Sequence, residues 1–346
     1  MTSAFAFGLD TFGDITADEH GTPNTHARVL REVIEEAVLA DDLGLDAFGV
    51  GEHHRPDFSI SAPEVVLAAI AARTRRLLLG SAVTVLSTDD PIRVYERFST
   101  LDALSSGRAE VILGRGSFTE SYPLFGFDLA RYEELFEDRV SLFAELLKGG
   151  PVTWRGTTRA AVQGATVYPP IERGPLKTWI GVGGSPESVV RAARYGLPLT
   201  LAIIGGSPIR FRPFVDLYLK SLEKLGQPEL PIAVHSPGHV AATDERAREE
   251  LWPHYAAMMT RIGAERGWPP ASRAQFDREA GPDGALCVGS PDTVAEKITR
   301  TVRALGLARF NLKYSNGMLP HAAMMKSIEL IGTRVAPRLR EALAPA

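Results

Sequence analysis

Two adjacent histidines stand at the end of an apolar run, in the stretch Phe48-Gly-Val-Gly-Glu-His-His-Arg-Pro-Asp57. The residues before them predict a buried strand over 47–51, and Pro56 biases the residue before it away from helix. An imidazole that changes protonation near pH 7 suits general acid–base chemistry, so His53 and His54 are candidate proton-transfer residues. Neighbouring side chains of a strand point to opposite faces, so we expect one imidazole to face a site. The alternative is a structural histidine pair bonded to the backbone.

Glu52 precedes the histidines and is a second candidate catalytic residue. Its carboxylate could orient a histidine or form an ion pair with Arg55. The chain contains no HExxH sequence and no Cys/His ligand spacing, so we predict no metal site.

A possible anion site is encoded further along the chain. Arg115 stands between two glycines, and Gly183-Gly-Ser-Pro186 reads as a turn into a helix. Backbone N–H groups at a helix start and a forked guanidinium both favour a phosphate. A tight turn beside a solvated arginine explains the same residues equally well.

Apolar runs alternate with helical patterns along the whole chain, which predicts a parallel sheet. Eight alternating units without a linker favour a closed (β/α)8 TIM barrel, a single domain over residues 1–346. Less regular stretches predict insertions at about 118–130, 151–176 and 255–285. In a barrel the carboxyl ends of all strands open on one face, so the histidines and the anion site should share a pocket. The eight strands are expected at residues 4–9, 47–51, 77–86, 109–113, 178–182, 199–204, 232–241 and 310–314.

Composition excludes several classes of protein. The 346 residues are 45% hydrophobic and carry a net charge of −4, which argues against nucleic acid as the main partner. The single cysteine, Cys287, allows no internal disulfide, and no secretory signal or membrane-length apolar run is present. We therefore expect a cytoplasmic protein with no membrane partner. GxGxxG, GxxxxGK[ST] and GxSxG sequences are absent, which counts against nicotinamide Rossmann, P-loop and hydrolase chemistry.

Several segments together resemble the bacterial luciferase-like flavin-dependent monooxygenases, and they occur in the order of that family. No single motif is decisive, but the ordered set is specific. The segments are Gly51-Glu-His-His-Arg55, Gly80-Ser-Ala-Val-Thr-Val-Leu-Ser-Thr88, Asp90-Pro-Ile-Arg93, Leu101-Asp-Ala-Leu-Ser-Ser-Gly-Arg108, Leu113-Gly-Arg-Gly-Ser117 and Ile180-Gly-Val-Gly-Gly-Ser185.

The resemblance implies that reduced FMN binds at the carboxyl end of the barrel. His53 matches the family histidine beside the flavin, and Arg115 matches the arginine that binds the FMN phosphate. The remaining expected contacts are Gly183, Gly184, Ser185 and Ser188 at the phosphate, and a non-proline cis peptide at Ala82-Val83 behind the flavin ring. Luciferase has a glutamate at the position of Gly184 and a cysteine at that of Gly114, so light emission is in doubt here.

The resulting hypothesis is an FMN-dependent monooxygenase that uses O2 to oxygenate a small organic substrate. It implies a separate flavin reductase and a homodimer. The alternatives are a deazaflavin-dependent hydride-transfer enzyme, a non-catalytic flavin-binding protein, and a barrel enzyme acting on a sugar or phosphate. The last lacks the paired strand-end carboxylates of a glycosidase. Thr11, Phe12 and Phe118 are expected to shape substrate choice.

Overall fold

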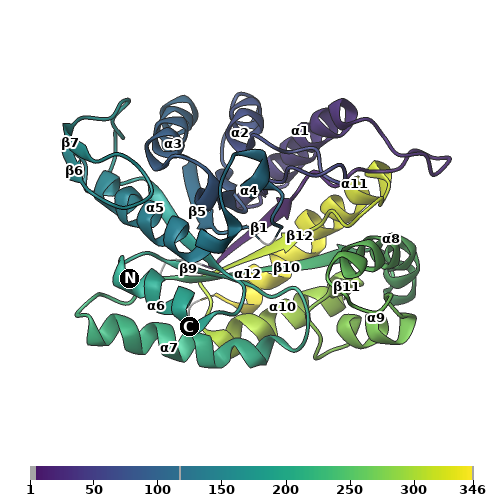
Figure 1. The fold of residues 1–346 in the computed structure, drawn as a ribbon. Coiled ribbons are helices and arrows are strands. Elements are labelled where there is room, and N and C mark those ends of the chain that lie inside the picture. The colour runs from purple at the N-terminus through teal and green to yellow at the C-terminus, as the bar shows by residue number, and fades with distance from the viewer. Residues whose placement is uncertain (1–4, 117, 345–346) are drawn as a thin grey trace.

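Eight parallel strands close into a barrel in the computed structural model, which describes residues 5–116 and 118–344. Each strand pairs with its neighbour in chain order, and β12 returns to pair with β1 (Figure 1). The predicted closed barrel is therefore confirmed. Its strands are β1 (Ala6–Thr11), β2 (Ala47–Val50), β3 (Leu78–Ser81), β5 (Ala109–Gly114), β8 (Lys177–Val182), β9 (Leu199–Ala202), β10 (Ile232–Val240) and β12 (Arg309–Lys313).

Helices surround the barrel and bury one apolar face each against it (Figure 1). In the first helix, Val29, Val33, Ala37 and Ala40 are all buried, at the spacing of one helical face. The surrounding helices are α1 (His26–Asp42), α2 (Pro63–Ala71), α3 (Pro91–Ser105), α5 (Tyr132–Leu147), α6 (Pro186–Arg194), α7 (Arg212–Lys224), α10 (Pro291–Leu305) and α11 (His321–Leu330). A π-helical turn (Ile331–Val335) joins α11 to α12 (Ala336–Ala342).

The third predicted strand, over residues 77–86, is interrupted. After β3 the chain passes through a cis peptide bond between Ala82 and Val83, forms β4 (Thr84–Val85) beside β5, and ends in a 3₁₀ turn (Leu86–Thr88). The expected cis bond is therefore present. The interruption turns the chain aside at the mouth of the barrel, where a continuous strand would have run straight.

The three less regular stretches contain short elements of their own. Residues 118–130 include α4 (Ser121–Leu124) and the start of a 3₁₀ turn (Leu129–Arg131), and residues 151–176 include the antiparallel pair β6 (Val152–Trp154) and β7 (Val162–Ala165).

Residues 255–285 are more helical than the sequence suggests. They hold the end of α8 (Asp244–Glu265) and all of α9 (Arg273–Ala280), followed by a short strand, β11 (Cys287–Gly289), that pairs with β10 outside the barrel. Thr243 and Ser272 cap the two helices through their side-chain oxygens.

Polar side chains fill the barrel interior below its mouth. A buried ion pair joins Arg309 of β12 to Glu110 of β5, and Glu110 also accepts from the indole of Trp179 at 3.3 Å. Arg309 in turn donates to Asn311 at 2.8 Å. Buried charges are tolerated only when paired in this way.

The described residues include no helix long and apolar enough to cross a bilayer.

Candidate active site

A cavity of about 630 Å³ opens at the carboxyl ends of the barrel strands. Its size is typical of small-molecule sites. Residues from every barrel strand, or from the loop after it, reach its wall, and α8 covers part of it with Tyr255, Met258, Met259 and Ile262. Of the predicted site residues, Ser188 does not line this cavity; those that do are Glu52, His53, Ala82, Val83, Arg115, Gly183, Gly184 and Ser185.

His53 lies in a box of aromatic rings at one end of the cavity. Its ring centroid is 4.7 Å from that of Phe12, 4.4 Å from that of Phe58 and 5.3 Å from that of Phe118. Among the described residues none is hydrogen-bonded to its imidazole. Desolvation, aided by the positive charge of Lys313, lowers the pKa of His53 to about 3. The imidazole is therefore neutral at physiological pH.

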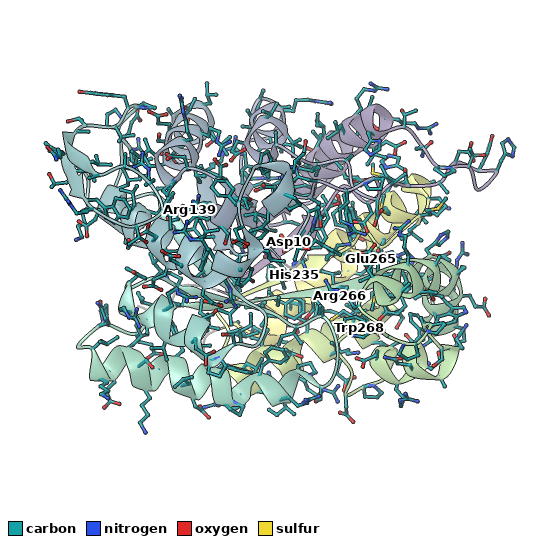
Figure 2. The ribbon with its side chains drawn as sticks, in the orientation of Figure 1. Asp10, Arg139, His235, Glu265, Arg266 and Trp268 are labelled. Carbon is teal, nitrogen blue, oxygen red and sulfur yellow. The ribbon has the colours of Figure 1, made fainter. Side chains whose placement is uncertain are left out.

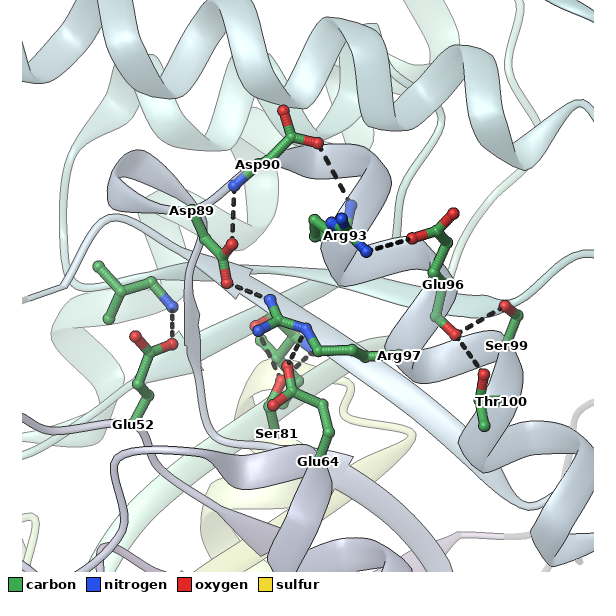
Figure 3. Close-up of polar contacts among 12 residues, drawn as sticks. Glu52, Glu64, Ser81, Asp89, Asp90, Arg93, Glu96, Arg97, Ser99 and Thr100 are labelled. Carbon is green, nitrogen blue, oxygen red and sulfur yellow. Dashed lines mark hydrogen bonds and ion pairs between the residues drawn. The ribbon is translucent and has the colours of Figure 1, made fainter. Parts of the chain in front are cut away.

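Glu52 does not contact His53 with its carboxylate. One oxygen lies 2.9 Å from Nε2 of His54, and the other accepts from the backbone N–H of Val85 at 2.8 Å (Figure 3). Its own N–H donates to the carbonyl of Val83. Of the two contacts considered for Glu52 in the sequence, the structure shows the one with a histidine, and that histidine is His54. Arg55 pairs instead with Glu265 and Asp57. Glu52 holds the backbone on both sides of Thr84 and so positions the cis segment.

Ion pairs hold the residues that follow the cis peptide bond and β4. Arg97 of α3 forms ion pairs with Asp89 and Glu64 (Figure 3). Burial raises the pKa of Glu64, against the opposing effect of Arg97. The turn after β4 is therefore tied to α2 and α3 at the edge of the cavity.

The side chain of Val83 occupies space that two glycines leave. A Cβ on Gly114 would lie 2.3 Å from Cγ2 of Val83, and one on Gly181 would lie 3.0 Å from its Cγ1. The glycine at 114, where luciferase has a cysteine, is therefore required by the valine opposite. Val83, Gly114 and Gly181 form an apolar part of the cavity wall between β3, β5 and β8, which we call the floor of the cavity.

A second region of the cavity wall contains Arg115 and the glycine turn before α6. Arg115 forms an ion pair with Glu133, and its guanidinium lies 4.9 Å from the ring centre of Tyr132. Gly183 and Gly184 are exposed, have open space beside them, and Gly184 has φ +119°, a conformation that favours glycine. The helix α6 starts directly after them.

The hydrogen-bond donors of Arg115 and Ser185 are paired with carboxylates. Glu187 accepts from the hydroxyl of Ser185 at 2.8 Å, and its pKa is lowered by its own backbone N–H and by that hydroxyl. Glu133, which is 61% exposed, bridges Arg115 and Arg191. A phosphate offers the same acceptor chemistry with more charge, so the residues present fit the phosphate of FMN.

Ser188 lies behind this region. It is buried, its backbone N–H is capped by Ser185 at 3.3 Å, and its hydroxyl accepts from Arg191 at 3.4 Å. Arg191 also contacts Glu137 at 2.6 Å. In the described structure Ser188 therefore supports the start of α6, and a direct contact with phosphate stays a prediction.

Of the residues expected to shape substrate choice, Phe12 and Phe118 line the cavity and Thr11 does not. Thr11 is buried and donates to Ser315 at 2.8 Å. Phe118 is held between two guanidinium groups, with Arg55 4.5 Å and Arg266 5.2 Å from its ring centre. Figure 2 shows Arg266 and Trp268 beside Glu265, near the end of α8.

Sequence reasoning missed part of the cavity wall. Asp10, Thr200, His235 and Lys313 all line it, from strands β1, β9, β10 and β12. The hydroxyl of Thr200 is buried without a hydrogen-bond partner among the described residues, so a ligand there would satisfy it. Asp10, Thr200 and His235 are each a polar residue within an apolar strand, and this pattern could have marked them as cavity residues in the sequence.

A closed parallel barrel with a ligand cavity at the carboxyl ends of its strands defines a (β/α)8-barrel protein. The chain belongs to the luciferase-like monooxygenase family, whose model matches residues 11–309. The resemblance inferred from the sequence is confirmed. A limonene 1,2-monooxygenase of Rhodococcus erythropolis is 27% identical over 98% of this chain and 89% of that protein. An uncharacterized protein y4wF of Sinorhizobium fredii is 34% identical, over 57% of this chain and only 56% of that protein.

Solved structures show the same fold. The monooxygenase RslO1 from Streptomyces bottropensis superposes with a TM-score of 0.83 at 22% identity, covering 96% of this chain and 99% of the other. The oxygenating constituent of 3,6-diketocamphane monooxygenase of Pseudomonas putida, in complex with FMN, gives 0.78 at 18% identity, with coverage of 97% and 99%. An F420-dependent secondary alcohol dehydrogenase gives 0.75 at 16% identity, with the same coverage.

Proposed function

We propose that the protein is an FMN-dependent monooxygenase that oxygenates a small, mainly apolar organic substrate. The observation that carries the proposal is one cavity whose wall has two chemically different regions: a neutral imidazole among aromatic rings, and an arginine beside the start of a helix. A flavin mononucleotide has a matching division into an apolar ring and an anionic tail.

In this proposal Arg115, Gly183, Gly184 and Ser185 hold the phosphate, and Ala82 and Val83 support the ring. When bound, reduced FMN supplies two electrons and two protons, so that one atom of O2 enters the substrate and the other leaves as water. The aromatic box and α8 exclude water from the reacting atoms. His53, neutral and unbonded to described residues, can hold a proton at one ring nitrogen and accept a hydrogen bond at the other, and so orient the reacting groups.

The first test is direct titration with FMN and with the deazaflavin F420, followed by quenching of flavin fluorescence. We expect FMN to bind more tightly than riboflavin, which lacks the phosphate. Preferential binding of F420 would replace the proposal with a hydride-transfer enzyme. Binding of neither would overturn it.

The second test supplies reduced FMN from a separate flavin reductase and measures oxygen uptake with a panel of terpenes, aldehydes and phenols. We expect product formation coupled to oxygen consumption with at least one class. Oxygen consumption that yields only hydrogen peroxide with every class, in wild type and His53→Ala alike, would favour a non-catalytic flavin-binding protein. The homodimer implied by the resemblance is tested by light scattering.

A further inference from the structure

A second imidazole, that of His235, lines the same cavity and also contacts Phe12. His235 of β10 is stacked on Phe12, with ring centroids 5.6 Å apart and an interplanar angle of 6°. Its Nδ1 lies 2.8 Å from Oδ2 of Asp10, a fully buried carboxylate of β1 (Figure 2). Asp10 is held in turn by Asn311, which donates to its other oxygen at 3.1 Å.

The free nitrogen of His235 is available to a ligand. A carboxylate accepts hydrogen bonds, so Nδ1 carries the proton of the Asp10 contact and Nε2 presents a lone pair. Among the described residues none is hydrogen-bonded to Nε2, although the side chain is only 9% exposed and lines the cavity. The ammonium of Lys313 lies 4.7 Å from the ring centre of Phe12, so a cation–π contact helps to hold the ring on which His235 is stacked.

We propose that His235, oriented by Asp10, binds and deprotonates the substrate, which is therefore a mainly apolar molecule with one acidic hydroxyl group, a phenol or an enol. This inference rests on the proposed function and adds a substrate class to it. The surrounding wall is apolar or aromatic, with Tyr255, Met258, Met259 and Ile262 contributed by α8. A substrate without a hydroxyl would leave the Nε2 lone pair desolvated and unpaired.

The step transfers one proton. The O–H bond of the substrate breaks, its electron pair stays on the oxygen, and the proton forms an N–H bond at Nε2. The imidazolium so formed is stabilised by the Asp10 carboxylate. The resulting phenolate or enolate is more electron-rich and accepts oxygen more readily. The two cavity histidines thus differ: His53 has no carboxylate beside its ring and resists protonation, whereas His235 has one at 2.8 Å.

Other groups around His235 come from each neighbouring element. Lys313 on β12 adds positive charge that favours an anionic substrate, although it is paired with Asp14 at 2.9 Å. His53 also contacts Phe12, with ring centroids 4.7 Å apart, and its pKa of about 3 keeps it uncharged. On β9, Ala202 is the strand partner of His235 and does not titrate.

The experiment uses 4-nitrophenol as the probe, because its phenolate is yellow and its ionisation can be read directly while bound. It is done with the FMN-loaded protein and repeated with the protein free of flavin. For wild type we expect the bound probe to ionise about one pH unit or more below the free probe. For His235→Phe we expect that shift to vanish and the affinity to fall about tenfold or more. His235→Asn, which keeps a donor to Asp10 without basicity, should also lose the shift.

Two controls separate binding from general damage. His239→Gln changes another histidine of the same strand, which pairs with Glu250 at 2.9 Å and does not line the cavity, and should behave as wild type. Nitrobenzene, which lacks the hydroxyl, should bind wild type and His235→Phe equally. Equal probe affinity and ionisation in wild type and both His235 variants would overturn the inference, as would failure of wild type to bind the probe.

The outcome is distinguishable from failure of the proposed function. If FMN does not bind, the flavin-free measurement still reports on His235. If reduced FMN supports oxygenation of terpenes or aldehydes but of no phenol or enol, the inference on substrate class is wrong and the monooxygenase proposal stands.

Discussion

At the Arg115 end of the cavity, charged groups pair with one another close to water, whereas at the His53 end aromatic rings surround an uncharged imidazole. Arg115, Glu133 and Arg191 form a chain of ion pairs in which Glu133 is 61% exposed. His53 contacts three phenylalanine rings and has a pKa of about 3. The difference teaches that, within this cavity, charged groups are paired with one another, whereas the imidazole enclosed by aromatic rings has no charged partner and stays neutral.

Replacing His53 tests the apolar end and should have the largest effect. Under the proposed function, His53→Ala should lower the rate of substrate oxygenation about 100-fold or more, because removing one positioned hydrogen-bonding group from the reacting atoms costs on that order. FMN affinity should change little, because the phosphate contacts lie at the other end. The measurement is product formation under saturating reduced FMN, with His239→Gln as the control. An unchanged rate would remove His53 from the mechanism.

Removing Arg115 tests the charged end. Arg115→Ala should weaken FMN binding about 10- to 100-fold, the loss expected for a charge-assisted hydrogen bond to phosphate. Riboflavin binding should be unaffected, because riboflavin has no phosphate. Arg131→Ala, which removes an exposed arginine paired with Glu134 and absent from the cavity wall, is the matched control. Equal weakening of FMN and riboflavin would contradict a phosphate contact.

The floor between the two ends depends on close packing. Gly114→Ala places a Cβ 2.3 Å from Cγ2 of Val83, and we expect the free energy of unfolding to fall by about 1–3 kcal/mol. Val83→Ala in the same chain should restore most of the loss. Gly183→Ala, where nothing lies within 4 Å, is the control. Urea unfolding measures all three, and a double variant no better than Gly114→Ala would disprove the contact.

The pKa of His53 also predicts a pH dependence of stability. Its ordinary pKa near 6.5 applies to the unfolded chain, so between pH 6.5 and about 3 the unfolded state binds one proton more than the folded state. Stability therefore rises with pH through this window and falls on acidification, by at most ~1.4 kcal/mol per pH unit. Urea unfolding at pH 6.5 and 5 should show a smaller loss for His53→Gln than for wild type. Identical losses would mean that His53 is not desolvated.

The smallest effect is expected for Glu133, whose carboxylate forms an ion pair with Arg115. Glu133→Gln removes the negative charge beside the phosphate position, and FMN affinity should rise about threefold, in the range of a partly exposed ion pair. Glu134→Gln, at the neighbouring position and paired with Arg131, should leave it unchanged. Isothermal titration calorimetry resolves the difference. Weaker binding in Glu133→Gln would show that Glu133 positions Arg115 for the phosphate.

The sequence predicted the barrel well because its signal is repeated eight times. Each of the eight expected strands corresponds to an observed barrel strand, although residue 4 of the first lies outside the described residues. Boundaries moved by one or a few residues, and the short β11 was missed because three residues give too little pattern. The break after β3 could not come from hydrophobicity alone, since residues 77–86 are apolar except for Ser81 and Thr84 and read as one strand.

The candidate site divides in the same way. His53 and Arg115 were found because ionisable residues at strand ends stand out from their neighbours. Glu52 was found as well, but its partner was not, because the choice between His53, His54 and Arg55 depends on side-chain direction. The Asp10–His235 contact joins residues 225 positions apart, and no local pattern connects them.

By itself the sequence determined the alternation of strands and helices, and with it the single face on which polar strand ends must meet. It also determined the types of group available there, an imidazole, a guanidinium and a glycine turn. Tertiary structure alone decided which groups meet: α8 over the cavity, Val83 between two glycines, and Asp10 behind His235. The physical reason is that periodicity is local to a segment, whereas contacts across a closed barrel are fixed only when all eight strands are in register.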